Sequence, residues 1–158
     1  MSIPGNAATA PEDRVLTMTR IFDAPRSLVF KVWTEPQHLV CWWGPNGYTT
    51  PVCDMDVRPG GAYRLRMRSA EGQEVLWHGV FREIVEPERL VWTCSIDRTD
   101  GTHVSGETVL TLTLEEQGQK TKLTLHQAVF DSIDNCKAHR EGWTQALERI
   151  AGHLAEAA

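Results

Sequence analysis

The sequence predicts an α+β domain in which a curved antiparallel sheet wraps around one long C-terminal helix. Apolar residues recur at steps of three, four and seven from Ile133 to Leu154, which is one face of an α-helix. Between residues 48 and 126, alternating apolar and polar runs are separated by short turns, as in hairpin-connected strands. Such a sheet has one apolar face, and only this helix is long enough to cover it.

The chain before the sheet contains the first strand and two short helices. Residues 1–12 are small and polar, and we expect them to be disordered, with a single domain over residues 13–158. A strand is predicted over 15–22. The first helix should begin with Asp23 or Ala24 near its cap and Pro25 in its first turn, and the second should run over 36–41. The buried stripe of the first helix is predicted to be Leu28, Val29, Val32 and Trp33.

Six further strands are expected before the long helix. They are predicted over residues 48–57, 62–68, 74–85, 89–96, 108–114 and 120–126, with a polar loop over 97–106. Asp131 or Ser132 should cap the long helix. Gly142, inside that helix, predicts a close approach of the sheet or of a neighbouring chain, because glycine lowers helix stability.

Composition narrows the classes of function. The chain has 158 residues and a net charge of −5, which argues against a nucleic-acid partner. No secretory signal and no apolar run of about 18 residues is found, so no membrane partner is expected. Cysteines 41, 53, 94 and 136 have no metal-like spacing and indicate reduced thiols in a cytoplasmic protein. We therefore expect no metal and no cofactor, and a monomer or homodimer.

Aromatic residues are the most informative candidates for a site. Tyr63, Trp77 and Phe81 fall on the predicted inner face, as do Trp92 and Trp143, and they form either a solid core or the wall of a cavity. Trp42 and Trp43 are adjacent in the sequence, directly before Gly44. They either fill one end of the core or line the mouth of a pocket. The predicted cavity residues are Trp42, Trp43, Tyr63, Met67, Trp77, Phe81, Trp92, His126, Trp143 and Leu147.

No catalytic motif is present in the sequence. It contains no nucleophile elbow, zinc-protease helix, phosphate-binding loop or dinucleotide fingerprint, so no catalytic residue is predicted. His126 ends the last predicted strand. It either faces the cavity or is a structural histidine whose ring nitrogens form hydrogen bonds within the protein.

Several short motifs, taken in this order, resemble a known family. They are residues 22–25 (FDAP), 28–33 (LVFKVW), 42–45 (WWGP), 58–61 (RPGG), 87–90 (PERL), and Gly142-Trp143 with Leu147. They are similar to the activator of heat-shock protein ATPase homologue-like family, within the START-like, birch-allergen-like SRPBCC superfamily. The resemblance implies a helix-grip fold and, as the usual theme of the superfamily, apolar ligands in a central cavity.

Three hypotheses of function follow from this resemblance and the aromatic residues. The first is a binding protein for a small hydrophobic or aromatic molecule, held in a central cavity. The second is a protein-interaction module, similar to the co-chaperone domain, that acts through its surface. The third is a cyclase- or hydrolase-type enzyme. A closed aromatic core would favour the second, and a cavity holding a paired His/carboxylate or Tyr/Arg would favour the third.

Overall fold

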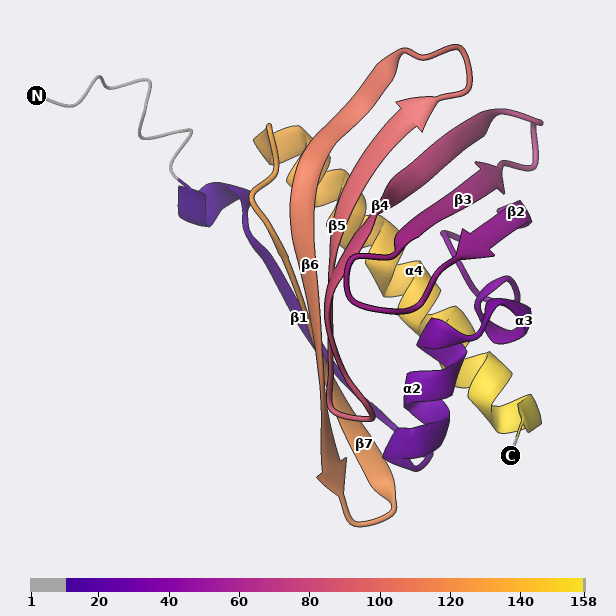
Figure 1. Ribbon diagram of the computed structural model, residues 1–158, viewed down its shortest axis with the longest axis vertical. Coiled ribbons are helices and arrows are strands. Elements are labelled where there is room, and N and C mark those ends of the chain that lie inside the picture. The colour runs from indigo at the N-terminus through magenta and orange to yellow at the C-terminus, as the bar shows by residue number, and fades with distance from the viewer. Residues whose placement is uncertain (1–10, 158) are drawn as a thin grey trace, which may run out of the picture.

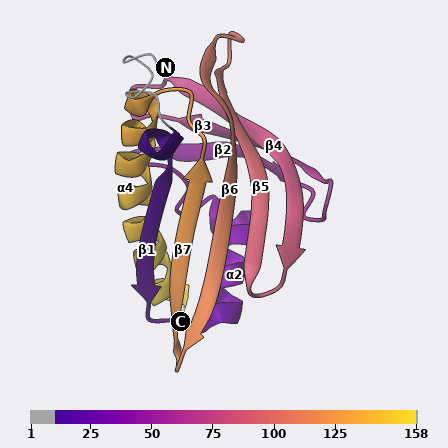
Figure 2. The ribbon, with the colours of Figure 1, turned by 90° about the vertical axis from the view of Figure 1, so that its left-hand side faces the viewer.

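Seven antiparallel strands form one sheet in the order β1-β7-β6-β5-β4-β3-β2. The computed structural model describes residues 11–157. Its strands are β1 (Leu16–Phe22), β2 (Thr49–Met55), β3 (Ala62–Arg68), β4 (Glu74–Val85), β5 (Arg89–Arg98), β6 (His103–Gln117) and β7 (Lys120–Ala128). The sheet curves around α4 (Ile133–Ala157), which crosses its concave side (Figure 1, Figure 2). This architecture confirms the predicted α+β helix-grip class.

The remaining helices lie at the beginning of the chain. The 3-10 helix η1 spans Pro11–Arg14, so the last two residues of the segment expected to be disordered begin a helical turn. The rest of that expectation falls on residues 1–10, outside the described residues. Helices α2 (Arg26–Thr34) and α3 (Pro36–Leu39) connect β1 to β2, which are the two opposite edges of the sheet.

Helix α4 begins where the sequence predicts. The Ser132 hydroxyl oxygen accepts a hydrogen bond from the backbone N–H of Asn135 at 3.0 Å, which makes Ser132 the N-cap. The buried face of the helix consists of Cys136, Trp143, Ala146, Leu147, Ile150 and Leu154. In the described part of the chain, no helix is both long and apolar enough to cross a membrane.

The predicted polar loop over 97–106 is wrong in most of its length. Strand β5 continues to Arg98 and β6 begins at His103, so that only a short turn separates them. On the solvent side of these strands, Asp97 pairs with His78 at 2.8 Å and with His103 at 3.0 Å. These cross-strand contacts hold polar residues in extended strands, although their composition resembles a loop.

The two short helices differ from the prediction by one or two residues. Pro25 is the N-cap of α2, rather than a residue of its first turn. The helix buries Phe30, whereas Leu28 is only partly buried. Helix α3 ends at Leu39, and the chain continues in turns as far as the segment that forms the rim of the site described next.

Candidate functional site

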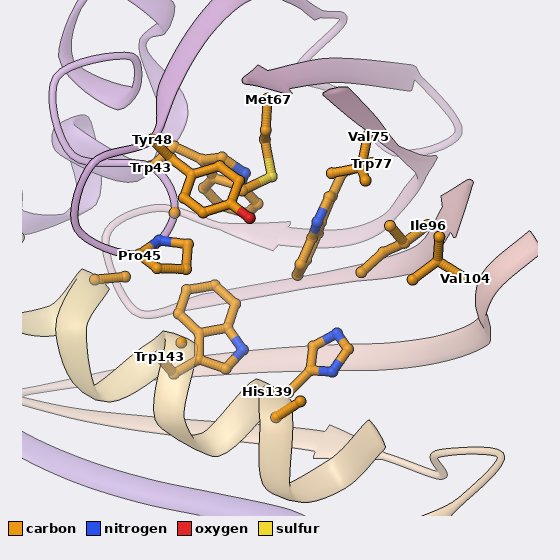
Figure 3. Close-up of a pocket in the computed structure, with 14 residues that line it drawn as sticks. Trp43, Pro45, Tyr48, Met67, Val75, Trp77, Ile96, Val104, His139 and Trp143 are labelled. Carbon is orange, nitrogen blue, oxygen red and sulfur yellow. The ribbon is translucent and has the colours of Figure 1, made fainter. Parts of the chain in front are cut away.

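An apolar pocket of about 220 Å³ lies between α4 and the concave face of the sheet (Figure 3). One wall is the N-terminal half of α4, and the opposite wall comes from β3, β4, β5 and β6. The segment over residues 43–48, here called the rim loop, closes one side. The lining residues are Trp43, Gly44, Pro45, Tyr48, Met67, Val75, Trp77, Ile96, Val104, Ala138, His139, Gly142, Trp143 and Ala146.

Small residues on α4 create the space. Ala138, Gly142 and Ala146 are spaced by four residues, so they follow one another along a single face of the helix. A Cβ atom added at Gly142 would meet only Pro45, at an ordinary contact distance of 3.6 Å. The expected close approach of the sheet to Gly142 is therefore wrong: this glycine faces the pocket and its rim.

Three indoles meet nearly edge to face around the pocket. The ring of Trp43 lies at 90° to that of Trp77 and at 88° to that of Trp143, with centroids 5.0 and 5.5 Å apart. The Trp77 and Trp143 rings meet at 89°. Perpendicular packing is a favoured arrangement of aromatic rings, and it places three indoles around an apolar space that suits a planar aromatic guest.

Trp143 is held by a buried polar chain. Its Nε1–H donates to Gln127 Oε1 at 2.9 Å, and Gln127 Nε2 donates to the Thr108 hydroxyl at 2.9 Å. All three side chains are buried. Because a buried donor and acceptor satisfy each other, the chain fixes the orientation of the Trp143 indole at the pocket wall.

His139 places an imidazole beside the indoles. Its ring lies between Trp77 and Phe130, with centroids 5.7 and 4.6 Å away. Its Nδ1 is 2.9 Å from the carbonyl oxygen of Asn135. Burial lowers the pKa of His139, against the opposing effects of that hydrogen bond and of the Asp131 charge.

Two polar groups of pocket residues lack a hydrogen-bond partner in the described part of the chain. One is Trp43 Nε1, which is buried within the protein. The Tyr48 hydroxyl points into the space between Trp43 and Trp77 and makes no hydrogen bond within residues 11–157 (Figure 3). An apolar pocket with a few orienting polar groups is typical of small-molecule sites.

The rim loop is fastened to α4 by the Arg149 guanidinium and by Gln145, whose Oε1 accepts a hydrogen bond from the Asn46 N–H at 2.9 Å. Arg149 Nη1 donates to the carbonyl oxygens of Trp43, Gly44 and Pro45 at 3.0, 2.9 and 2.9 Å. Gly44 has a φ of +90°, a backbone conformation that glycine adopts far more readily than other residues, so the loop geometry favours glycine there. The loop therefore has one defined position against the helix.

Only part of the predicted cavity set lines this pocket. Trp43, Met67, Trp77 and Trp143 do so. Tyr63, Phe81 and Trp92 lie deeper, around a void of about 10 Å³, too small for a ligand. They pack on one another, with Tyr63–Phe81 and Phe81–Trp92 centroids 5.6 and 6.0 Å apart, and fill the space where the prediction places the cavity.

The other three predicted residues, Trp42, Leu147 and His126, lie outside the pocket. Trp42 is a core anchor, because its Nε1 donates to the Val32 carbonyl oxygen at 2.8 Å. Leu147 is buried in the core but is not a pocket residue. His126 is exposed, and its Nδ1 lies 3.1 Å from the Thr17 hydroxyl rather than in the cavity. Of the two adjacent indoles, one therefore plugs the core and the other lines the pocket.

His139 is the most polar of the pocket residues that the sequence prediction did not include. It lies three residues after Cys136 and four before Trp143, which places it on the edge of the apolar stripe of α4. A polar residue at that position was the available signal. Within residues 11–157, no group of three or more His, Cys, Asp or Glu side chains is arranged to hold a metal ion.

Comparison with known proteins identifies the fold. A family model described as "Activator of Hsp90 ATPase homolog 1-like protein" matches residues 23–155. A crystal structure from Silicibacter pomeroyi is 25% identical, with a TM-score of 0.83, over 91% of this chain and 99% of that one. A Chromobacterium violaceum protein is 27% identical, with a TM-score of 0.77, over 88% and 95%. No curated protein matches.

Proposed function

The chain belongs to the Activator of Hsp90 ATPase homolog 1-like family, and we propose that it binds a small aromatic molecule in the pocket between α4 and the sheet. The ligand lies against the indoles of Trp43, Trp77 and Trp143. The observation that supports this most strongly is the unfilled apolar volume itself, because the aromatic core directly below it is packed almost without a void.

The volume limits the size of the ligand. An apolar cavity of about 150 Å³ is large enough to bind benzene. The pocket of about 220 Å³ is half as large again, which suits one substituted ring or two fused rings. Water in such a pocket has few hydrogen-bond partners, so its displacement by a planar apolar molecule is favourable.

The contacts of His139 support binding over hydrolysis. Its Nδ1 is paired with a backbone carbonyl oxygen, so His139 does not form the His/carboxylate pair that would favour a hydrolase- or cyclase-type enzyme. A surface interaction module is the alternative that gains support if the pocket binds nothing.

The indole N–H signals offer a direct test. The chain has six tryptophans, so a two-dimensional ¹H–¹⁵N spectrum contains six indole signals. Titration with indole or naphthalene should shift the signals of Trp43, Trp77 and Trp143 saturably and leave that of Trp92 unchanged. Saturable shifts elsewhere only, or no shifts at all, would refute the proposal.

A pair of glycines on α4 provides matched variants. Gly142→Leu projects a side chain into the pocket beside Pro45, whereas Gly152→Leu projects into open space. Both variants should fold, because leucine favours a helix more than glycine does. Gly142→Leu should lose binding and Gly152→Leu should bind like the wild type. Equal binding by the two variants would place the ligand elsewhere.

A further inference from the structure

The hydrogen bond of His139 determines what its second nitrogen can do. A carbonyl oxygen only accepts hydrogen bonds, so the Nδ1 atom that lies 2.9 Å from the Asn135 oxygen must hold the proton. In the neutral imidazole, Nε2 then has a lone pair and accepts a hydrogen bond. No hydrogen bond within the described residues uses this lone pair.

The surroundings keep this imidazole neutral. The rings that flank it, Trp77 and Phe130, carry no charge, and burial disfavours the protonated form. Asp131 is the nearby carboxylate that opposes this effect, and Tyr48 is the other titratable side chain that lines the pocket. Figure 3 shows Tyr48 and His139 on opposite sides of the pocket, with Trp77 and Trp143 between them.

Charge excludes one class of aromatic ligand. Among the described residues that line the pocket, none is positively charged. Arg149 lies nearby, but it is committed to the carbonyl oxygens of the rim loop. An aromatic carboxylate held inside the pocket would therefore lack a counter-ion, which is unfavourable. The lining thus favours an uncharged ligand.

We infer that the ligand is a neutral aromatic molecule with a hydroxyl group or a ring N–H, which donates its hydrogen bond to Nε2 of His139. This inference rests on the proposed binding function and makes His139 the residue that determines specificity. A ligand without the donor leaves Nε2 unpaired in an apolar pocket after its water is displaced. Sites of this kind discriminate strongly against analogues that lack the donor group.

Three naphthalenes of similar size test the inference. 2-Naphthol carries the donor, 2-methoxynaphthalene retains the oxygen without the donor, and naphthalene has neither. Calorimetric titration of the wild type should give a dissociation constant for 2-naphthol about tenfold or more below that of either analogue. Substitution of phenylalanine, His139→Phe, keeps a ring between Trp77 and Phe130 and should abolish the preference. His139→Gln, which provides an amide oxygen, should restore part of it.

A second measurement does not depend on the variants. In the wild type, the ¹⁵N resonance of His139 Nε2 should move on addition of 2-naphthol, as expected for an acceptor, and should not move on addition of 2-methoxynaphthalene. Equal affinities for the three naphthalenes, or a preference that survives in His139→Phe, would overturn the inference while the proposed function stands. Absence of binding by all three would overturn both.

Discussion

Replacing Trp143 with phenylalanine tests whether the buried polar chain on α4 stabilises the fold. The variant keeps an aromatic ring at the pocket wall but removes the N–H that donates to Gln127 Oε1. Gln127 is only 1% exposed, so its oxygen would lose its partner without gaining water. Leaving a buried acceptor unpaired costs about 1–3 kcal/mol.

The smaller ring adds a second cost. The loss of buried ring atoms lowers the free energy of unfolding by about 1–2 kcal/mol, at about 0.8 kcal/mol for each buried CH₂ equivalent. Trp143→Phe should therefore lose about 2–5 kcal/mol in all. For a domain of this size, each kcal/mol corresponds to about 2–4 °C in Tm.

Trp43→Phe is the matched control. Trp43 is 1% exposed and Trp143 is 4% exposed, and both line the pocket, but Trp43 Nε1 has no hydrogen-bond partner to lose. The control should lose only the ring contribution, about 1–2 kcal/mol. Urea unfolding followed by far-ultraviolet circular dichroism, with an unchanged m value, gives both numbers. Equal losses in the two variants would show that the Gln127 hydrogen bond contributes nothing.

Four further predictions concern the rim loop, the helix glycines and the pH dependence of stability at His139 and at Asp97. Arg149→Lys should lower the free energy of unfolding by about 1.5–3 kcal/mol, because one ammonium cannot reach all the carbonyl oxygens that the guanidinium bridges; an unchanged urea midpoint would contradict this. Gly142→Ala and Gly152→Ala should each raise the free energy of unfolding by up to about 1 kcal/mol, and with it Tm. A lower Tm in Gly142→Ala would mean that the added methyl group meets an atom closer than Pro45. Burial lowers the pKa of His139, so as the pH falls this side chain is protonated in the unfolded chain before it is protonated in the folded protein. The free energy of unfolding should therefore fall as pH drops below about 6.5, and it should fall less steeply in His139→Phe. Hydrogen bonds from histidines lower the pKa of Asp97, so its contribution is present above about pH 4 and should be lost as pH falls further, a decline that Asp97→Asn should remove.

Sequence patterns predict the strands well where buried and exposed residues alternate along the chain. Strand β3 alternates between buried Tyr63, Leu65 and Met67 and the arginines between them, and both its ends match the prediction. The pattern fails over 97–106, because the polar residues of that segment pair with each other across strands. Pairing between strands depends on tertiary register, which a single sequence does not contain.

The candidate site was harder to predict than the fold. The sequence places Tyr63, Phe81 and Trp92 on the inner face, and all three are buried there. Burial alone does not say where the helix and the sheet separate. That position is determined by the small residues Ala138, Gly142 and Ala146. Only Gly142 drew a prediction, a close approach of the sheet or of a neighbouring chain, and the approach of the sheet is wrong.

A crystal structure of the protein grown with saturating 2-naphthol tests the central claim most directly. Aromatic binding in this pocket predicts density for one bicyclic ring against Trp77 and Trp143, with its oxygen within hydrogen-bonding distance of His139 Nε2, about 2.7–3.2 Å. The claim would be contradicted if the pocket stayed empty, if its own side chains filled it, or if 2-naphthol bound elsewhere on the surface.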